Sequence, residues 1–196
     1  MMKRGFDIAF SLLLLCMLCP LWISISIVVI ADSKGGAFFR QTRVGKDGKN
    51  FRLWKFRTMR PKSESAGQLT VGANDMRITN AGKTLRKFKL DELPQLFNVL
   101  IGDMSLVGPR PEVPKYVAMY NAEQRRVLSI RPGITDHASL LYFEENELLA
   151  QSDDPEKTYI TEIMPAKLAL NLEYLNSNSF RGDITIILRT VQRMFS

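Results

Sequence analysis

The chain has 196 residues, which is enough to bury one sizeable core and predicts a single catalytic domain. It carries 27 Lys and Arg against 20 Asp and Glu, a net charge of +7. Its two cysteines, Cys16 and Cys19, have C-x-x-C spacing, but they lie in an apolar N-terminal run and the sequence holds no second ligand pair, so we interpret them as small hydrophobic residues.

The excess positive charge is concentrated between positions 34 and 62, where ten basic residues accompany one acid, Asp47. Such a segregated basic stretch indicates a phosphate-bearing partner, which is a nucleic acid, a lipid head group or a nucleotide. An acidic stretch at positions 144–156 is typical of a solvated face, with a metal site as the alternative for its carboxylates.

Residues 8–30 form a nearly uncharged run that is long enough to cross a bilayer. Pro20 lies at the centre of this run, where it predicts a kink or break in the helix. A cleaved signal peptide is the weaker interpretation, because the run is long and no small-residue cleavage pattern follows it.

The basic flanks of this run favour one of two membrane topologies. Lys3 and Arg4 precede the run and Lys34 follows it, so both ends carry the charge expected on the cytoplasmic side. The sequence therefore favours a re-entrant membrane helix over residues 1–32, followed by a cytoplasmic catalytic domain over residues 33–196. A single kinked span across the membrane is the alternative.

Residues 37–41 and 50–56 form two short extended runs in which aromatic and basic residues alternate. The Asp47-Gly48 pair between them is a hairpin turn signal, so we expect a small β-hairpin with basic outer positions. The same alternation also binds single-stranded nucleic acid, but the adjacent membrane segment makes that interpretation the weaker one. Residues 60–74 are rich in Ser, Gly and Lys and predict a mobile loop.

Two adjacent acids, Asp91 and Glu92, are followed closely by Pro94. Residues 81–90 predict a helix, which cannot continue through Pro94 because proline lacks an amide proton and clashes with an earlier carbonyl. Pro94 fits the first turn of a second helix with Asp91 at or near its N-cap. The two carboxylates then lie at a helix junction, beside free N–H groups that suit an anion. An ordinary capping acid with a solvated neighbour is the alternative.

Residues 96–101 form an apolar run that is closed by Gly102. Farther along, Pro109 and Pro111 fix two φ angles around Arg110, an arrangement that holds a guanidinium in place. A rigid turn with an exposed arginine is the alternative.

The remaining helices are predicted from spacing and caps. Residues 116–128 indicate a surface helix, and Pro165 fits the first turn of a helix that ends near residue 175. Asp183 is the predicted cap of a last helix, whose apolar residues recur at helical spacing. That pattern suits packing on a core and also a position in the membrane interface, and the membrane segment favours the interface.

Several motifs occur together and in one order. They occupy residues 38–41, 43–45, 55–59, 77–79, 85–86, 91–95, 102–111 and 131–135. In these motifs the chain resembles the bacterial sugar transferases, the monotopic phosphoglycosyl transferases that load a phosphosugar onto polyprenyl phosphate. The resemblance covers almost the whole chain, whose length is similar to that of the small members. Residues 136–139 depart from the pattern of many members, as in a different subgroup or sugar pocket, and Asn171 stands where some relatives carry Asp.

The resemblance implies a two-step reaction. The Asp91 carboxylate attacks the β-phosphate of a UDP-sugar and releases UMP, and the aspartyl-phosphosugar then passes to polyprenyl (undecaprenyl) phosphate. Mg²⁺, held by Asp91 and Glu92, offsets the repulsion between carboxylate and phosphates, while Glu92 organises the metal or handles a proton. The implied substrate-binding residues are Lys55, Arg86, Pro109, Arg110, Pro111 and Arg131.

We therefore expect an α+β fold, in which a re-entrant membrane helix and a small β-hairpin accompany a compact helical catalytic domain with interfacial amphipathic helices. The expected protein is monotopic, on the cytoplasmic face of the inner membrane, and takes the first membrane step of glycoconjugate biosynthesis. Its expected partners are a UDP-sugar, polyprenyl phosphate and membrane lipids, with no nucleic acid and with oligomerisation left open. The alternative is a basic membrane-surface scaffold that binds anionic lipid or nucleic acid without turnover.

Overall fold

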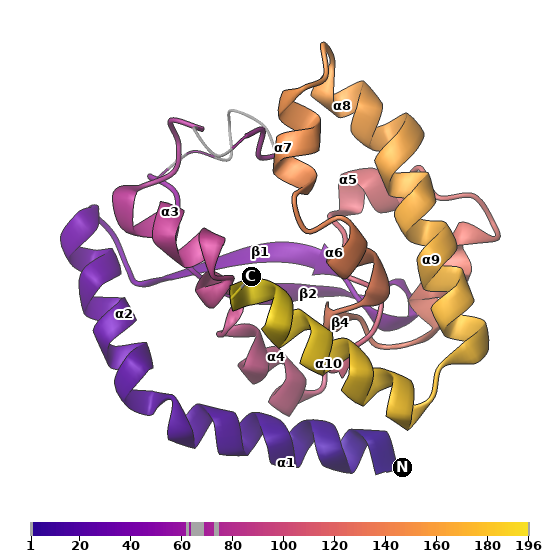
Figure 1. The fold of residues 1–196 in the computed structure, drawn as a ribbon, viewed down its shortest axis with the longest axis horizontal. Helices are drawn as coiled ribbons and strands as arrows, with labels where there is room; N and C mark the ends of the chain where they lie inside the picture. The colour runs from indigo at the N-terminus through magenta and orange to yellow at the C-terminus, as the bar shows by residue number, and fades with distance from the viewer. Residues whose placement is uncertain (1, 62, 64–68, 73–74, 196) are drawn as a thin grey trace.

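The computed structural model describes residues 2–61, 63, 69–72 and 75–195 (Figure 1). The N-terminal apolar run forms two helices, α1 (Met2–Met17) and α2 (Cys19–Asp32), which are bent by 64° at the break between them. Pro20 lies in the first turn of α2, where a missing amide proton needs no helical partner, so the predicted break is confirmed. Within the described residues no single helix has the length and apolarity to cross a membrane, whereas the bent pair together meets both criteria.

The N-terminal end of this helix pair is held against the rest of the chain. Lys3 Nζ donates to the carbonyl of Val107 at 2.9 Å and forms an ion pair with the buried Asp183. Arg4 Nη1 donates to the carbonyl of Val99 at 2.7 Å. The basic residues that precede the apolar run therefore bind other parts of the protein.

Farther along α1, Asp7 is also committed to the body of the protein. Its side chain is buried, and its carboxylate accepts hydrogen bonds from Ser105 Oγ at 2.7 Å and from the backbone N–H of Leu106 at 3.3 Å. A carboxylate in an apolar helix is costly unless it is hydrogen-bonded, so these contacts fix how α1 packs.

The other end of the pair is held by Arg57, which is 8% exposed. Its guanidinium donates to the carbonyls of Lys34 (2.5 Å), Gly36 (2.7 Å), Ser33 (2.9 Å) and Val29 (3.3 Å). The last carbonyls of a helix lack partners within the helix, and a cation there also complements the helix dipole. Arg57 therefore caps α2 from the segment that follows the hairpin.

Arg57→Lys should lower the free energy of unfolding by about 2 kcal/mol, because one ammonium group cannot serve all of these carbonyls. Denaturant unfolding in detergent or nanodiscs measures the change. The matched control is Arg181→Lys, at an exposed position of α10 (Phe180–Phe195), which should leave the unfolding midpoint unchanged. Equal midpoints for the two variants would contradict the capping role.

The predicted hairpin is confirmed. β1 (Phe38–Val44) pairs antiparallel with β2 (Asn50–Phe56), and Asp47 in the turn has a φ of 56°, a left-handed conformation that Asp tolerates better than most residues. Trp22 of α2 packs edge to face on Phe56, with ring centroids 5.4 Å apart. The hairpin therefore lies against α2.

The sequence does not predict the second sheet, in which β3 (Ser105–Val107) pairs parallel with β4 (Gly133–Thr135). A Cβ atom on Gly133 would lie 2.1 Å from the backbone N of Gly108, so this close approach requires glycine. The Gly133 N–H also donates to the carbonyl of Pro109 at 3.0 Å. The pairing thus places the Arg110 loop beside the 131–135 motif.

The helix before the two acids is shorter than predicted. α3 (Asn80–Lys87) begins at Thr79, whose hydroxyl accepts a hydrogen bond from the first turn at 3.0 Å. It ends early because Lys89 adopts a left-handed φ of 51°. The next helix, α4 (Gln95–Ile101), follows the prediction, ends at Gly102 with a φ of 100°, and packs against α1.

The predicted surface helix over residues 116–128 is wrong. The segment contains only α5 (Pro114–Val117) and the 3₁₀-helix η4 (Gln124–Ser129). Asn121 and Gln124 exchange side-chain-to-backbone hydrogen bonds at 2.9 Å, which compete with a continuous helix through this segment. Four side chains of the segment are buried, so it is not a surface helix. They are Tyr116, Val117, Tyr120 and Val127.

The C-terminal part of the chain is helical. Its elements are α6 (His137–Leu141), α7 (Glu145–Ala150), α8 (Pro155–Thr158), the π-helical turn η5 (Tyr159–Ile163), α9 (Met164–Ser177) and α10. Pro165 lies in the first turn of α9, as predicted. Asp183 as the cap of the last helix is wrong, because Ser179 Oγ accepts from Gly182 N at 3.1 Å while Asp183 is buried and accepts from Tyr174 at 2.7 Å.

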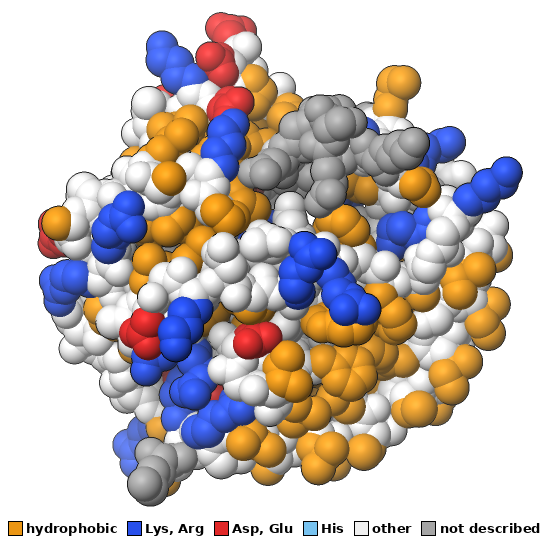
Figure 2. All heavy atoms as spheres, turned by 180° about the vertical axis from the view of Figure 1, so that it is seen from behind, with side chains coloured by type: hydrophobic (Ala, Val, Ile, Leu, Met, Phe, Trp, Pro, Cys, Tyr) orange, Lys and Arg blue, Asp and Glu red, His pale blue; other side chains and the backbone are white. Residues whose placement is uncertain are grey.

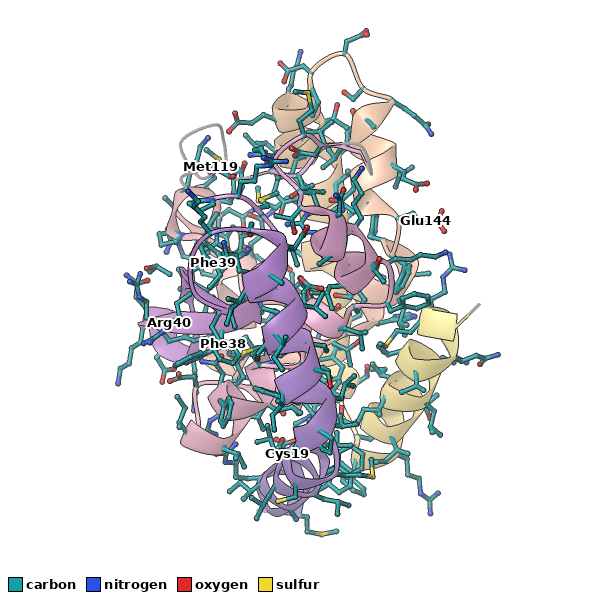
Figure 3. The ribbon with its side chains drawn as sticks, turned by 90° about the vertical axis from the view of Figure 1, so that its left-hand side faces the viewer. Cys19, Phe38, Phe39, Arg40, Met119 and Glu144 are labelled. Carbon is teal, nitrogen blue, oxygen red and sulfur yellow. The ribbon has the colours of Figure 1, made fainter. Side chains whose placement is uncertain are left out.

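The predicted mixture of helix and sheet is confirmed. The α1–α2 pair leaves apolar side chains exposed on the surface of the protein. Figure 2 shows hydrophobic side chains gathered toward the lower right, where α1 and α2 lie. Exposed members include Leu13, Met17, Ile23 and Ile27. Figure 3 looks onto α2, with Cys19 at the bend near the bottom of the view and Glu144 toward the right. Positions 62, 64–68 and 73–74 of the predicted 60–74 loop lie outside the described residues.

Candidate active site

A cavity of about 1050 Å³ collects most of the predicted site residues. Those that line it are Lys55, Arg86, Asp91, Glu92, Pro109, Arg110 and Pro111. Arg131 is not among its described lining residues: it is exposed, and its Nε donates to the carbonyl of Gly102 at 2.8 Å. The structure therefore brings together seven of the eight predicted residues and places the eighth apart.

The two acids lie on a tight turn between α3 and α4. Because Lys89 is left-handed, residues Leu90–Glu92 form the 3₁₀-turn η3, and both Asp91 and Glu92 are buried. Asp91 as the N-cap of the following helix is wrong, since Pro94 takes that position and no side chain caps α4. The carboxylate of Asp91 is thus not used to cap a helix.

Glu92 is held between two cations. Arg110 binds it through two N–H groups, with Nη1 at 3.0 Å from Oε2 and Nη2 on Oε1, and Lys55 Nζ lies 3.1 Å from Oε1. Burial by itself would raise the pKa of Glu92, but Arg110 and Lys55 outweigh burial and hold this pKa well below its usual range. Glu92 is therefore a carboxylate whose two oxygens are already bonded.

Asp91 has the opposite environment. Its Oδ1 is buried and finds no hydrogen-bond partner in the part of the chain that the structure describes, and its Oδ2 is 4.0 Å from Lys55 Nζ. Burial raises the pKa of Asp91 and the charge of Glu92 adds to the rise, while Lys55 and Arg86 oppose it. A buried carboxylate oxygen without a partner, in a cationic cavity, is a sign of a functional group rather than a structural one.

Asp91→Asn should raise stability at neutral pH. Because the folded-state pKa of Asp91 is raised, the unfolded chain loses this proton first, and wild-type stability falls as pH rises from the ordinary aspartate pKa through the raised one. Asn does not titrate, so the stability of the variant relative to wild type should increase with pH between these two pKa values. Below the ordinary aspartate pKa the difference should vanish. Thermal unfolding over a pH series checks this against the exposed control Asp153→Asn, and a pH-independent difference would contradict it.

The cations are held in place by residues that the sequence does not single out as site residues. The backbone N–H of Arg110 donates to Asp136 at 3.0 Å, and Arg86 Nε donates to Thr58 Oγ1 at 2.9 Å. Asp136 is fully buried and also caps α6. The ion pair with Glu92 raises the pKa of Arg110, whereas burial lowers the pKa values of Lys55 and Arg86. The only sequence signal for Asp136 is its departure from the family pattern.

Two further polar residues line the same cavity. Asn171 Oδ1 and Ser139 Oγ are buried, and neither has a hydrogen-bond partner among the residues described. They come from α9 and α6, which pack together. The cavity thus joins a carboxylate, several cations and neutral polar groups, a set that suits a charged and hydroxylated ligand.

A model of the family described as bacterial sugar transferase matches residues 1–196. The chain belongs to the bacterial sugar transferase family. Curated relatives of this bacterial sugar transferase include the UDP-N-acetylgalactosamine-undecaprenyl-phosphate N-acetylgalactosaminephosphotransferase of Aeromonas hydrophila, which is 35% identical over 99% of the chain and 44% of the relative. A UDP-glucose:undecaprenyl-phosphate glucose-1-phosphate transferase of Escherichia coli (strain K12) is 35% identical over 100% of the chain and 40% of the relative. The sugar transferase EpsL of Bacillus subtilis (strain 168), described as uncharacterized, is 37% identical over 98% of the chain and 87% of the relative.

The bacterial sugar transferase described here spans less than half of the first two relatives. Its cavity is nevertheless built from the motifs that gave the family resemblance, because the hairpin, the turn at Asp91, the Arg110 loop and the 131–135 segment all contribute lining residues.

Proposed function

We propose that this chain transfers a sugar phosphate from a UDP-sugar to undecaprenyl phosphate, through a covalent intermediate on Asp91. The observation that carries the proposal is the buried Oδ1 of Asp91 inside a cationic cavity, where it has no hydrogen-bond partner among the described residues. The names of the relatives from Aeromonas hydrophila and Escherichia coli, which specify UDP-linked donors and undecaprenyl phosphate, support the substrates.

Two displacements at phosphorus complete the proposed reaction. A carboxylate oxygen of Asp91 forms a bond to the β-phosphorus of the donor, and the bond to the bridging oxygen breaks, so UMP leaves with the electron pair. A phosphate oxygen of the lipid then attacks the same phosphorus, and the Asp91 carboxylate is released. Lys55 and Arg86 line the same cavity, which supports a role for them in offsetting the charge of the phosphates.

Glu92 fits the role of a positioning residue in this scheme. Its carboxylate binds Arg110 through both oxygens and Lys55 through one, so it fixes two cations beside Asp91. Arg110 is in turn held by Asp136 through its backbone. These bonds favour a role for Glu92 in positioning the two cations over a role in proton transfer.

The donor set fits Mg²⁺, which proteins bind through one or two carboxylates together with substrate phosphates. Asp91 offers a buried oxygen without a partner within the described chain, whereas both oxygens of Glu92 are bonded to Arg110. We therefore assign the metal to Asp91 and leave Glu92 as its neighbour. When bound, Mg²⁺ supplies positive charge that reduces the repulsion between carboxylate and diphosphate.

We further propose a monotopic protein on the cytoplasmic face of the inner membrane. Lys3 near the start of α1 pairs with Asp183, and the carbonyl of Lys34 just beyond α2 accepts from Arg57, so both ends of the pair contact the rest of the chain, which is compatible with two ends on one side. Pro20→Leu should shift the helix pair toward a span, because it removes the residue that interrupts the helix. Labelling of a cysteine at position 2 from outside intact cells, in a background without Cys16 and Cys19, measures this. Labelling of the Pro20 protein itself would contradict the proposed topology.

Release of UMP tests the proposed reaction. The protein is incubated with a panel of UDP-sugars, undecaprenyl phosphate and Mg²⁺, and UMP and lipid product are measured together. The proposal expects lipid-dependent UMP release with at least one donor. No release with any donor would favour the non-catalytic membrane-surface scaffold, which the exposed apolar helices and the basic hairpin also suit.

A further inference from the structure

Helices α1 and α10 meet at their N-terminal ends and diverge toward their C-terminal ends (Figure 1). At the closed end, Lys3 pairs with Asp183, and the rings of Phe6 and Phe180 pack edge to face with centroids 5.2 Å apart. Both helices also contact β3. The two helices therefore form a V, and the part of the large cavity that both helices line is called the α1–α10 wedge.

The inner walls of this α1–α10 wedge are apolar. Phe10 and Leu14 of α1, and Ile187 and Val191 of α10, line the same cavity as Asp91. Leu96 and Leu106, which are buried, line it as well and belong to the core cluster on which Phe10, Leu14 and Ile187 pack. Val191 is 50% exposed, so the wedge reaches the surface of the protein. The same cavity thus contains the two acids and an apolar part that reaches the surface.

The chemistry of the cavity changes along its length. The wedge side chains are uncharged, whereas Lys55 and Arg86 line the cavity near Asp91. On the outer faces of the same helices, Leu13 and Leu188 are exposed and are not among the described lining residues. A ligand that matches this arrangement has an anionic head, for the cations near Asp91, and an apolar chain, for the wedge. The apolar outer faces of the two helices suit a ligand that comes from apolar surroundings.

We infer that the α1–α10 wedge binds the first isoprene units of the polyprenyl phosphate acceptor and guides its phosphate to Asp91. The identity of the lipid rests on the proposed function, because the relatives are named for undecaprenyl phosphate. The wedge itself rests on the positions of α1 and α10. A membrane phospholipid, which also has an anionic head, is the competing occupant.

Photolabelling tests the wedge without requiring turnover. The probe is a polyprenyl phosphate that carries a diazirine within its first isoprene units, added to the full chain in nanodiscs. Label is expected on peptides that contain Leu14 and Ile187, and unmodified polyprenyl phosphate should compete whereas phosphatidylglycerol should not. Equal label on the outer face of α2, at Ile23 and Ile27, or equal competition by phosphatidylglycerol, would overturn the inference.

Matched tryptophan substitutions supply a second readout. Val191→Trp and Leu14→Trp fill the wedge and should each reduce labelling and raise the KM for polyprenyl phosphate by about tenfold. Leu188→Trp and Leu13→Trp add the same ring to the same helices on their outer faces and should leave both quantities near wild type. Wedge variants that match these controls, with the same melting temperatures, would overturn the inference.

The outcomes separate this inference from the proposed function. Specific labelling of the wedge without UMP release from any donor would support the lipid site and refute the proposed reaction. Transfer to lipid that is equally efficient in wedge and control variants would support the reaction and refute the wedge.

Discussion

Asp91→Asn should lose the covalent adduct and lower turnover by roughly a thousandfold or more, as removal of a nucleophile does in other enzymes. The substitution keeps the size of the side chain but replaces the anionic nucleophile with a neutral amide. With UDP-sugar and Mg²⁺ but no lipid, the wild-type mass should rise by one sugar-phosphate unit, and peptide mapping should place it on Asp91. The Asn variant should show no such rise.

Folding of the Asn variant is the necessary control, and here the structure gives a sharp expectation. Burial makes the charge of Asp91 costly, as its raised pKa reflects. The inactive variant should therefore be at least as stable as wild type at neutral pH. Asp153→Asn, at an exposed position, should keep full activity. Substantial turnover by Asp91→Asn would instead move the nucleophile to Glu92 or imply direct transfer between donor and lipid.

Arg110→Lys should lower turnover by about a hundredfold, the cost typical of losing a preorganised donor. Lysine keeps the charge but cannot reproduce the two-point contact with Glu92 or the fixed direction of a guanidinium between two prolines. Glu92 would then depend on Lys55, which would draw that ammonium away from Asp91. Steady-state UMP release measures the loss.

Arg181→Lys on α10 is the matched control for this substitution and should behave as wild type. A structural role alone would lower the melting temperature of Arg110→Lys without a specific loss of turnover in the folded fraction. Wild-type kinetics in Arg110→Lys would reduce residues 109–111 to a rigid turn.

Local signals in the sequence predict several parts of this fold. Pro20 marks the bend, the Asp47-Gly48 pair marks the hairpin, and Gly102 marks the end of α4. Each of these depends on a backbone conformation that only a few residue types favour, so it can be recognised from its immediate neighbours. The adjacent acids and the proline-flanked arginine can also be recognised from the sequence, and the fold brings them to one cavity.

Features that depend on distant contacts cannot be recognised in this way. The left-handed Lys89 is not a residue type that signals such a turn, yet it orients both acids. The β3–β4 pairing joins strands too short for a periodic pattern. Asp136 holds Arg110 across the sequence, and Asp183 binds Lys3 instead of capping its own helix, because burial and partners outweigh local preference.

The buried Asp7 has a consequence for how this protein is made and handled. Its carboxylate is satisfied by Ser105 and Leu106, and the carboxylate of Asp183 is matched by Lys3. If α1 were cut away, Asp183 would lose its cation, and the apolar side chains on which α1 packs would meet water. The helix pair is thus an integral part of the fold and not a detachable anchor. Under the proposed topology, insertion of the helices and completion of the fold would therefore be one coupled event.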